Sequence, residues 1–214
     1  MLWIFLAQIE KMIRIIFRFL WKAKREVTSC LMWVQYACMR NAFFRRLGPG
    51  THFYGKVRFG SVEGNIDVGK NCGIGDSVFL SASKGAFVRI GDRSSLNTGC
   101  HLVAVYGIEI GEDSHLGEYC SIRDQNHEFK DADTPISHQG YCGATIRIGR
   151  DVWIGRGVFV GPGVQIGDGA VIGANSVVTK SIPKNSISVG VPARIIGRRE
   201  SQTQRTFFED QSNF

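Results

Sequence analysis

Aliphatic residues recur at every sixth position in the second half of the chain. The stretch 148–178 reads IGRDVWIGRGVFVGPGVQIGDGAVIGANSVV, and its repeated aliphatic residues are Ile148, Ile154, Val160, Ile166, Ile172 and Val178. A helix exposed on one face repeats apolar residues about every 3.6 positions, and a half-exposed strand alternates them every second position. A period of six fits neither element, so it belongs to a larger repeated unit.

The same spacing occurs upstream in three shorter runs. These are Val68, Ile74 and Leu80; Ile90, Leu96 and Leu102; and Ile110, Leu116 and Ile122. Each unit is long enough for one short strand and one turn, with the aliphatic residue and the small residue four positions later pointing inward. Gly or Asn would supply the positive φ at the corner. Three units make one triangular coil, and coils stack at about 4.8 Å through strand hydrogen bonds. We therefore expect an all-β fold, a parallel β-helix, over residues 51–199.

A long excursion interrupts the repeat. Ile122 and Ile148 are 26 residues apart, which is not a multiple of six, and residues 123–145 between them are polar. We expect this segment to project from the coil as a loop, and long loops on a regular scaffold tend to carry function. His127 lies near its start, and histidine is the side chain that ordinarily exchanges a proton near neutral pH. The loop is therefore the candidate active site.

The first 50 residues show a different, amphipathic pattern. In LWIFLAQIEKMIRIIFRFLW (2–21), large apolar residues surround charges at Glu10, Arg14 and Arg18, which form one narrow polar stripe on a helix. The longest uncharged run has eight residues, too few to span a bilayer. A second apolar stretch, 29–44, has Ser29 as a candidate N-cap. We expect 1–50 to be a helical segment.

Two interpretations of this segment remain open. The helices could cover the β-helix or pack in an oligomer, or residues 1–46 could lie on a membrane surface with their bases toward anionic headgroups. Three of the four tryptophans lie here, which suits an interface, and we favour the membrane. A cleaved signal peptide is disfavoured because no base precedes the apolar run. Residues 200–214 are polar and are expected to form a flexible tail.

The distribution of charge and of cysteines limits the kinds of ligand and partner that we expect. Nine of the 26 Lys and Arg residues, but two of the 19 acidic residues, lie in the first 50 positions, so the net charge of +7 belongs to that segment. The remainder is neutral, and we expect no nucleic-acid partner. No Cys-x-x-Cys pair or zinc-like Cys/His spacing occurs among the six cysteines. Cys72, Cys100 and Cys120 occupy the small inward position, which predicts buried, reduced thiols and suits the cytosol.

The repeats resemble those of a known enzyme family. The stretch DVWIGRGVFVGPGVQIGDGAVIGANSVVTKSIPKNSISVGVPARIIG (151–197) is similar to the hexapeptide-repeat O-acetyltransferases of the maltose, galactoside, nodulation-factor and capsule or O-antigen group. The resemblance covers about residues 55–200. It implies a left-handed coil, acetyl-CoA as the donor, and a homotrimer whose active sites lie between subunits.

The resemblance also implies roles for particular residues. His127 matches the family's general base, although the Pro that often follows that histidine is replaced here by Glu128. Asn97 matches an asparagine that contacts the acceptor; an asparagine at a left-handed corner is the alternative reading. Trp153 would lie against the acetyl end of the donor, reached from a neighbouring subunit. The backbone N–H near Arg156 would donate to the oxyanion.

The remaining matches concern coenzyme A. Ala174, Thr179, Lys180 and Arg194 match the family's coenzyme A contacts, and Lys and Arg suit its phosphates. His101 and His115 fall at positions expected to face outward, and His138 lies on the same loop as His127, where it could touch substrate. The zinc-dependent carbonic anhydrases of this fold use three histidines, including a pair separated by four residues. This chain has no such pair after residue 100, and we expect no metal.

These observations favour one function over two others. We expect an acetyl-CoA-dependent O-acetyltransferase that acts on a sugar hydroxyl in surface polysaccharide or lipid-linked glycan synthesis, at the cytoplasmic face of a membrane. The transfer would be direct, with no acyl-enzyme. An N-acetyltransferase on an amino sugar is one alternative, and a non-catalytic β-helix scaffold is the other. The coincidence of His127, Trp153 and Lys180 at family positions speaks against the scaffold.

Overall fold

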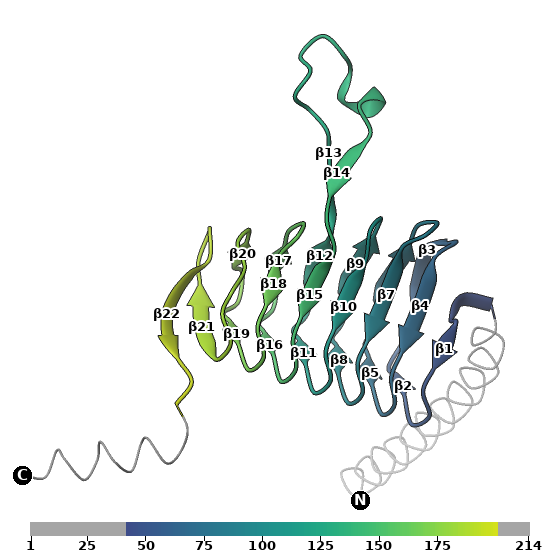
Figure 1. Ribbon diagram of the computed structural model, residues 1–214. Helices are drawn as coiled ribbons and strands as arrows, with labels where there is room; N and C mark the ends of the chain where they lie inside the picture. The colour runs from purple at the N-terminus through teal and green to yellow at the C-terminus, as the bar shows by residue number, and fades with distance from the viewer. Residues whose placement is uncertain (1–41, 201–214) are drawn as a thin grey trace, which may run out of the picture. The chain divides into compact units, whose positions relative to one another are not determined.

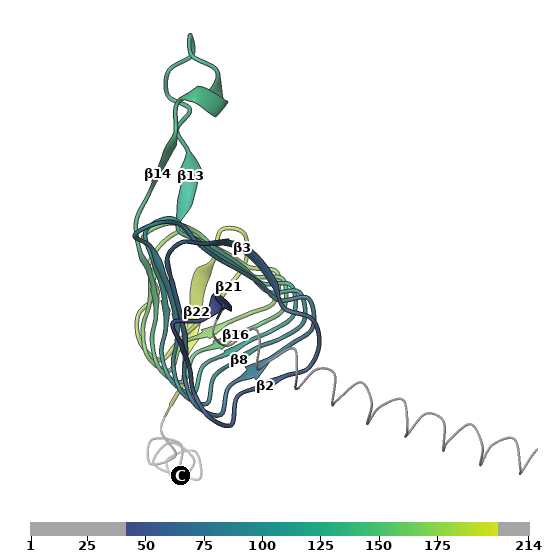
Figure 2. The ribbon, with the colours of Figure 1, turned by 90° about the vertical axis from the view of Figure 1, so that its right-hand side faces the viewer.

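Short parallel strands wind around a triangular coil. The computed structural model of the protein describes residues 42–200, and in them the chain visits three sheets in turn, which we call A, B and C. Seen from the N-terminal end, the chain runs anticlockwise as it recedes (Figure 2), so the coil is left-handed. The expected left-handed parallel β-helix is confirmed.

The strands stack in register from coil to coil (Figure 1). Sheet A contains β1 (Arg46–Leu47), β4 (Asn65–Val68), β7 (Phe87–Ile90), β10 (Ile108–Ile110), β15 (Ile146–Ile148) and β18 (Gln165–Ile166). Sheet B contains β2 (His52–Phe53), β5 (Gly73–Ile74), β8 (Ser95–Leu96), β11 (His115–Leu116), β16 (Trp153–Ile154), β19 (Val171–Ile172), β21 (Ser186–Val189) and β22 (Arg194–Arg198). Sheet C contains β3 (Arg58–Val62), β6 (Phe79–Ala82), β9 (His101–Ala104), β12 (Ser121–Arg123), β17 (Phe159–Val160) and β20 (Val177–Val178).

The sixfold aliphatic residues form three inward ladders. In sheet A, Ile110 pairs with Ile90 on one side and Ile148 on the other. All fifteen of the positions picked out by the period are at most 4% exposed. Full burial of one such side chain contributes about 1.5–3 kcal/mol, so these ladders are the main source of stability. The period of six is therefore explained as one inward residue per side of the triangle.

Glycines serve two separate purposes at the corners. The positive φ falls three residues after most ladder residues, as at Gly99 (φ 69°) after Leu96 and Asn175 (φ 58°) after Ile172. This confirms Gly and Asn at the corners, but Tyr119 (φ 59°) shows that other residues also occupy the position. The glycine directly after the ladder residue has another role. A Cβ at Gly75 would lie 2.5 Å from the next coil's backbone, so that glycine permits close stacking.

The inward cysteines join neighbouring coils. Cys72, Cys100 and Cys120 are at most 1% exposed, and their thiols are free. The Sγ of Cys100 lies 3.0 Å from the carbonyl oxygen of Gly117 in the next coil, and that of Cys120 lies 3.1 Å from Gly155. Burial raises the pKa of the Cys72 thiol. The prediction of buried, reduced thiols is confirmed at these three positions, which we call the slot thiols.

The two ends of the coil are closed differently. At the start, the buried ring of Phe44 packs on Phe53 and Phe59, and β1 pairs with β4. The coil thus begins at Arg46, five residues before the boundary expected at 51. At the far end, β21 pairs with β22 in antiparallel fashion.

The predictions for 1–41 and 201–214 lie outside the described residues. Between 42 and 200, no helix is long and apolar enough to cross a membrane.

Candidate active site

A β-hairpin, which we call the arm, projects from the coil at the break in the repeat (Figures 1 and 2). Its strands are β13 (Gln125–His127) and β14 (Tyr141–Gly143), paired antiparallel, and a short 3₁₀ helix, η1 (Ile136–His138), lies near its tip. The arm follows β12 in sheet C and precedes β15 in sheet A, so it leaves the coil at the corner between those sheets. The projecting segment expected at 123–145 is present.

The neck of the arm is held by a buried carboxylate. Asp124 is 0% exposed, and its Oδ1 accepts the backbone N–H of Val105 at 2.9 Å. Its Oδ2 accepts the N–H groups of Tyr106 at 2.8 Å and Gly107 at 2.5 Å. A buried carboxylate is stable only with such partners. Its backbone oxygen also accepts the N–H of Ala144 at 3.0 Å, so one residue joins both strands of the neck to the preceding coil.

The candidate base lies on the arm beyond this neck. His127 is exposed, and its backbone pairs with Tyr141 across the hairpin. The two rings meet with centroids 4.5 Å apart and planes tilted by 39°. The Tyr106 hydroxyl donates to the backbone oxygen of Tyr141 at 3.4 Å, linking β14 to the same turn that binds Asp124. His127 is therefore accessible to a substrate and restrained on one side.

The tip of the arm has its own polar framework. The Gln139 side chain donates to the backbone oxygens of Asp131 and Thr134, both at 2.7 Å, and accepts the N–H of Asp131 at 3.1 Å. The Thr134 hydroxyl donates to the Asp131 carboxylate at 2.6 Å, and this bond lowers the pKa of that carboxyl group. His138 is exposed in η1, in the tip of the arm beyond the strand that carries His127.

Trp153 stands on the outer face of sheet B. It is 59% exposed, and its strand neighbours in register are His115 and Val171. His115 also faces outward, as expected, and its Nδ1 lies 2.8 Å from the Ser95 hydroxyl. An exposed tryptophan over a flat sheet offers a large apolar surface to a partner or ligand. His101, by contrast, is half-buried on sheet C against the ring of Phe79.

Four further candidates lie at the corner between sheets B and C. Asn97, Arg156 and Ala174 occur in the turns after β8, β16 and β19 and are exposed. Arg194 begins β22, opposite Val189 at the end of β21. Asn97 does not take the positive φ of the corner, which falls at Gly99. The corner interpretation of Asn97 is therefore wrong, and its exposed amide stays a candidate contact.

Thr179 and Lys180 lie at a different corner. Both are exposed in the turn after β20, between sheets C and A, which is the corner from which the arm leaves two coils earlier. Within one chain, His127 therefore shares a corner with Lys180, whereas Trp153 lies on sheet B, across the triangle (Figure 2). The predicted residues form two groups that a single chain does not bring together.

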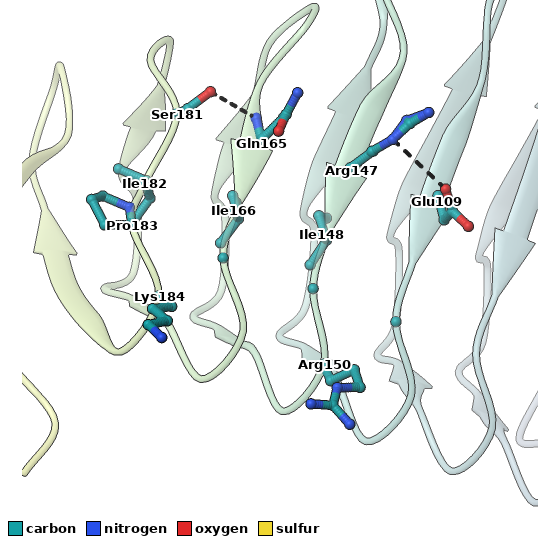
Figure 3. Close-up of a pocket in the computed structure, with 13 residues that line it drawn as sticks. Glu109, Arg147, Ile148, Arg150, Gln165, Ile166, Ser181, Ile182, Pro183 and Lys184 are labelled. Atoms are coloured by element: carbon teal, nitrogen blue, oxygen red, sulfur yellow. Dashed lines mark hydrogen bonds and ion pairs between the residues drawn. The ribbon is translucent and has the colours of Figure 1, made fainter.

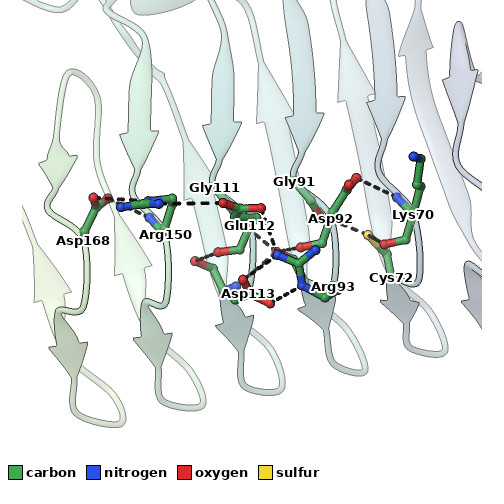
Figure 4. A network of polar contacts seen from close by, with 12 residues as sticks. Lys70, Cys72, Gly91, Asp92, Arg93, Gly111, Glu112, Asp113, Arg150 and Asp168 are labelled. Atoms are coloured by element: carbon green, nitrogen blue, oxygen red, sulfur yellow. Dashed lines mark hydrogen bonds and ion pairs between the residues drawn. The ribbon is translucent and has the colours of Figure 1, made fainter.

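A groove on sheet A belongs to neither group (Figure 3). It has a volume of about 540 Å³ and crosses β10, β15 and β18. Its arginines face carboxylates: Arg147 lies 4.0 Å from Glu109, and Arg150 lies 3.8 Å from Glu112 and 3.5 Å from Asp168 (Figures 3 and 4). Further along this edge, Arg93 bonds Glu112 and Asp113 in the same network (Figure 4). The groove's lining has three bases, Arg147, Arg150 and Lys184, and one acid, Glu109, and it contains none of the predicted residues.

The described residues offer no metal site, and three residues of the arm's anchor were not predicted. Among residues 42–200, no group of three or more His, Cys, Asp or Glu side chains is placed to hold a metal ion. Sequence reasoning missed Tyr106, Asp124 and Tyr141. The sequence does contain a signal for Tyr106, because Leu102 and Ile110 on either side of it are eight residues apart instead of six. That irregularity marks the turn on which the arm is anchored.

Comparison with known proteins places these features in a family. Residues 145–180 match the family model described as bacterial transferase hexapeptide (six repeats). A probable acetyltransferase of Mycobacterium tuberculosis is 34% identical over 154 residues, which cover 72% of this chain and 50% of that protein. A putative lipopolysaccharide biosynthesis O-acetyl transferase of Escherichia coli is 34% identical over 149 residues, which cover 66% of this chain and 76% of that one. The chain thus spans half of the mycobacterial relative.

Solved structures of acetyltransferases are also similar to this chain. A maltose O-acetyltransferase from Clostridium difficile is 32% identical, with a TM-score of 0.57, and the match covers 77% of this chain and 75% of that one. A galactoside acetyltransferase in complex with coenzyme A is 27% identical, with a TM-score of 0.56, over 78% of this chain and 72% of that one.

Proposed function

The chain belongs to the bacterial hexapeptide-repeat acyltransferases, and we propose that it transfers an acetyl group from acetyl-CoA to a sugar hydroxyl. Its relatives include O-acetyltransferases, and structural neighbours were solved with coenzyme A or acetyl-CoA. The single observation that carries the proposal is an accessible histidine, His127, on a braced arm at the one long break in the repeat.

His127 acts as the general base in this proposal. Its imidazole takes the proton of the acceptor hydroxyl while the hydroxyl oxygen forms a bond to the thioester carbonyl carbon. The carbonyl oxygen becomes an oxyanion, stabilised by a backbone N–H near Arg156. When the carbon–sulfur bond breaks, the thiolate of coenzyme A receives the proton from the imidazolium. The acceptor leaves as its acetyl ester, and no acyl-enzyme forms.

The complete site requires two copies of the chain. His127 and Lys180 lie at one corner of the triangle, and Trp153 lies on the opposite sheet. A neighbouring subunit in a homotrimer supplies the missing wall, because a closed ring repeats the same heterologous contact three times. Asn97 and Trp153 would then contact the acceptor and the acetyl end. Ala174, Thr179, Lys180 and Arg194 would hold coenzyme A, with the bases facing its phosphates.

The first experiment measures thiol release from acetyl-CoA with pooled glycan acceptors. Wild type should release coenzyme A only when an acceptor is present, and His127→Ala should lower kcat by about 10²–10⁴-fold. Matched hydroxy and amino sugars, each assayed alone, separate O-acetylation from N-acetylation. Equal release by both proteins would remove His127 from the mechanism, and coenzyme A binding without any transfer would favour a scaffold.

A complementation experiment tests the shared site. His127→Ala and Trp153→Ala are each made alone and then co-expressed in equal amounts. If each site combines His127 of one subunit with Trp153 of the next, about a quarter of the sites in randomly mixed trimers regain both side chains. The double variant, which can regain none, is the control. Mixed trimers with no recovered activity would place both residues in the same subunit's site.

We also propose that residues 1–46 hold the enzyme on the cytoplasmic face of a membrane, near lipid-linked glycans. The amphipathic, basic sequence supports this, since nine of the chain's bases lie in its first 50 residues. Vesicles with and without anionic lipid test it. Replacing Arg14, Arg18, Lys22 and Arg25 by Gln in the full chain should abolish binding to the anionic vesicles. Unchanged binding would contradict the proposal.

A further inference from the structure

The strand opposite His127 carries an aromatic residue that the chemistry above does not use. Tyr141 faces His127 directly across the hairpin, and their ring centroids are 4.5 Å apart. An imidazole on an exposed hairpin can rotate about two side-chain torsions unless a neighbour restricts it. Among the ring contacts between residues 42 and 200, this is the one that involves His127. Tyr141 is therefore placed to limit the orientations of the base.

Tyr141 is itself positioned by the coil. The hydroxyl of Tyr106 donates to its backbone oxygen at 3.4 Å, and the Tyr106 N–H is bound by the buried carboxylate of Asp124. Asp124 lies three residues before His127 on the same arm. The contacts thus form a continuous chain that runs from the coil, through Tyr106, to the strand that carries Tyr141, and then to the imidazole of His127.

We propose that Tyr141 is a positioning residue for His127, and that Tyr106 and Asp124 hold it in place. The proposal rests on the proposed function, because it assigns the network to the orientation of the general base. A base must lie within hydrogen-bond reach of the hydroxyl it deprotonates, and misplacement by about 1 Å can lower a rate about 100-fold. The network supplies that alignment from within one chain, whichever subunit completes the rest of the site.

The test compares Tyr141→Leu with Tyr141→Phe. Losing the ring should lower kcat about tenfold, with the KM for acetyl-CoA unchanged, because donor binding does not use the ring. Phe retains the ring and should recover most of the loss. In the His127→Ala background, Tyr141→Leu should have no further effect on the residual rate. A drop of less than twofold, or the same drop with and without His127, would overturn the proposal.

Two further measurements keep the inference testable if Tyr141→Leu folds poorly. Tyr106→Phe removes a single hydroxyl and should lower kcat about two- to threefold at unchanged melting temperature. The proton resonances of the His127 ring should shift in Tyr141→Leu, since a neighbouring aromatic ring perturbs them. No shift would contradict the contact. Wild-type activity that depends on His127 establishes the function independently, so the two proposals fail separately.

Discussion

Gly75 and Gly73 provide a matched test of how closely the coils stack. A Cβ added at Gly75 would lie 2.5 Å from the backbone nitrogen of Thr98 and 2.7 Å from the carbonyl carbon of Asn97. Both atoms belong to the next coil's backbone and cannot rotate away. At Gly73, two residues earlier, the nearest atom is the flexible edge of a side chain at 3.4 Å. Neither glycine has a positive φ, so alanine fits the backbone conformation at both.

The expected effects have opposite signs. Alanine at a compatible glycine stabilises a fold by about 0.4–1 kcal/mol, because it reduces the freedom of the unfolded chain. Gly73→Ala should show that gain. At Gly75 the overlap adds an overpacking cost of about 1–3 kcal/mol, so the net change is destabilising. The two variants should differ by about 2 kcal/mol in free energy of unfolding, or by about 4–8 °C in melting temperature for a domain of this size.

Thermal unfolding followed by circular dichroism measures this difference. The variants must be compared at equal protein concentration, because association shifts the apparent melting temperature of an oligomer. Gly75→Ala should melt below wild type, and Gly73→Ala at or above it. Equal melting temperatures for the two variants, or the reverse order, would refute the argument that stacking requires a glycine directly after a ladder residue such as Ile74.

Three further predictions follow from the arm and the slot thiols. Asp124→Asn replaces one acceptor oxygen by a donor that faces buried N–H groups. Amide hydrogen exchange in the Val105–Gly107 turn and in the arm should therefore accelerate. Unchanged protection would contradict the role of Asp124 in anchoring the arm. The hydrogen bond from Thr134 lowers the pKa of Asp131 in the folded protein. The ionised Asp131 therefore contributes fully to the stability of the arm's tip above about pH 3.9, the pKa in the unfolded chain, and the contribution is lost as the pH falls through the lower folded pKa. An NMR titration of the tip resonances would show this loss. Iodoacetamide should label half-buried Cys142 but leave the slot thiols unmodified in native protein, and peptide mass mapping would detect any exception.

The period of six was enough to predict the coil, because each repeated residue meets an identical environment on one side of the triangle. The same period places Trp153, which precedes the ladder residue Ile154, on the outer face, where it is exposed. The assignment of positive φ was only partly predictable. At Tyr119 the corner is imposed by the stacking of the coils on either side, which outweighs the local preference for Gly or Asn.

The anchoring of the arm could not be predicted from the repeat. Asp124 binds a turn at 105–107 that is formed in the preceding coil, so the partners are close in space through a register that only complete coils define. An isolated acid in a polar stretch carries no sign of burial. The pairing of Tyr141 with His127 depends in turn on how the hairpin closes, and hairpin register is set by turn geometry more than by composition.

The outer faces of the coil support the proposal that a second subunit forms the other wall of the site. A flat parallel sheet offers no concavity of its own, so a site for two substrates needs another surface beside it. On sheet A the outward residues alternate in charge through Arg89, Glu109 and Arg147, each in register with the next, which favours exposure to water. On sheet B the outward row continues instead from Trp153 to Val171 and Ile187. In the proposed homotrimer, the projecting arm with His127 and the apolar row on the sheet across the triangle would be the two complementary surfaces that a heterologous ring repeats at each of its contacts.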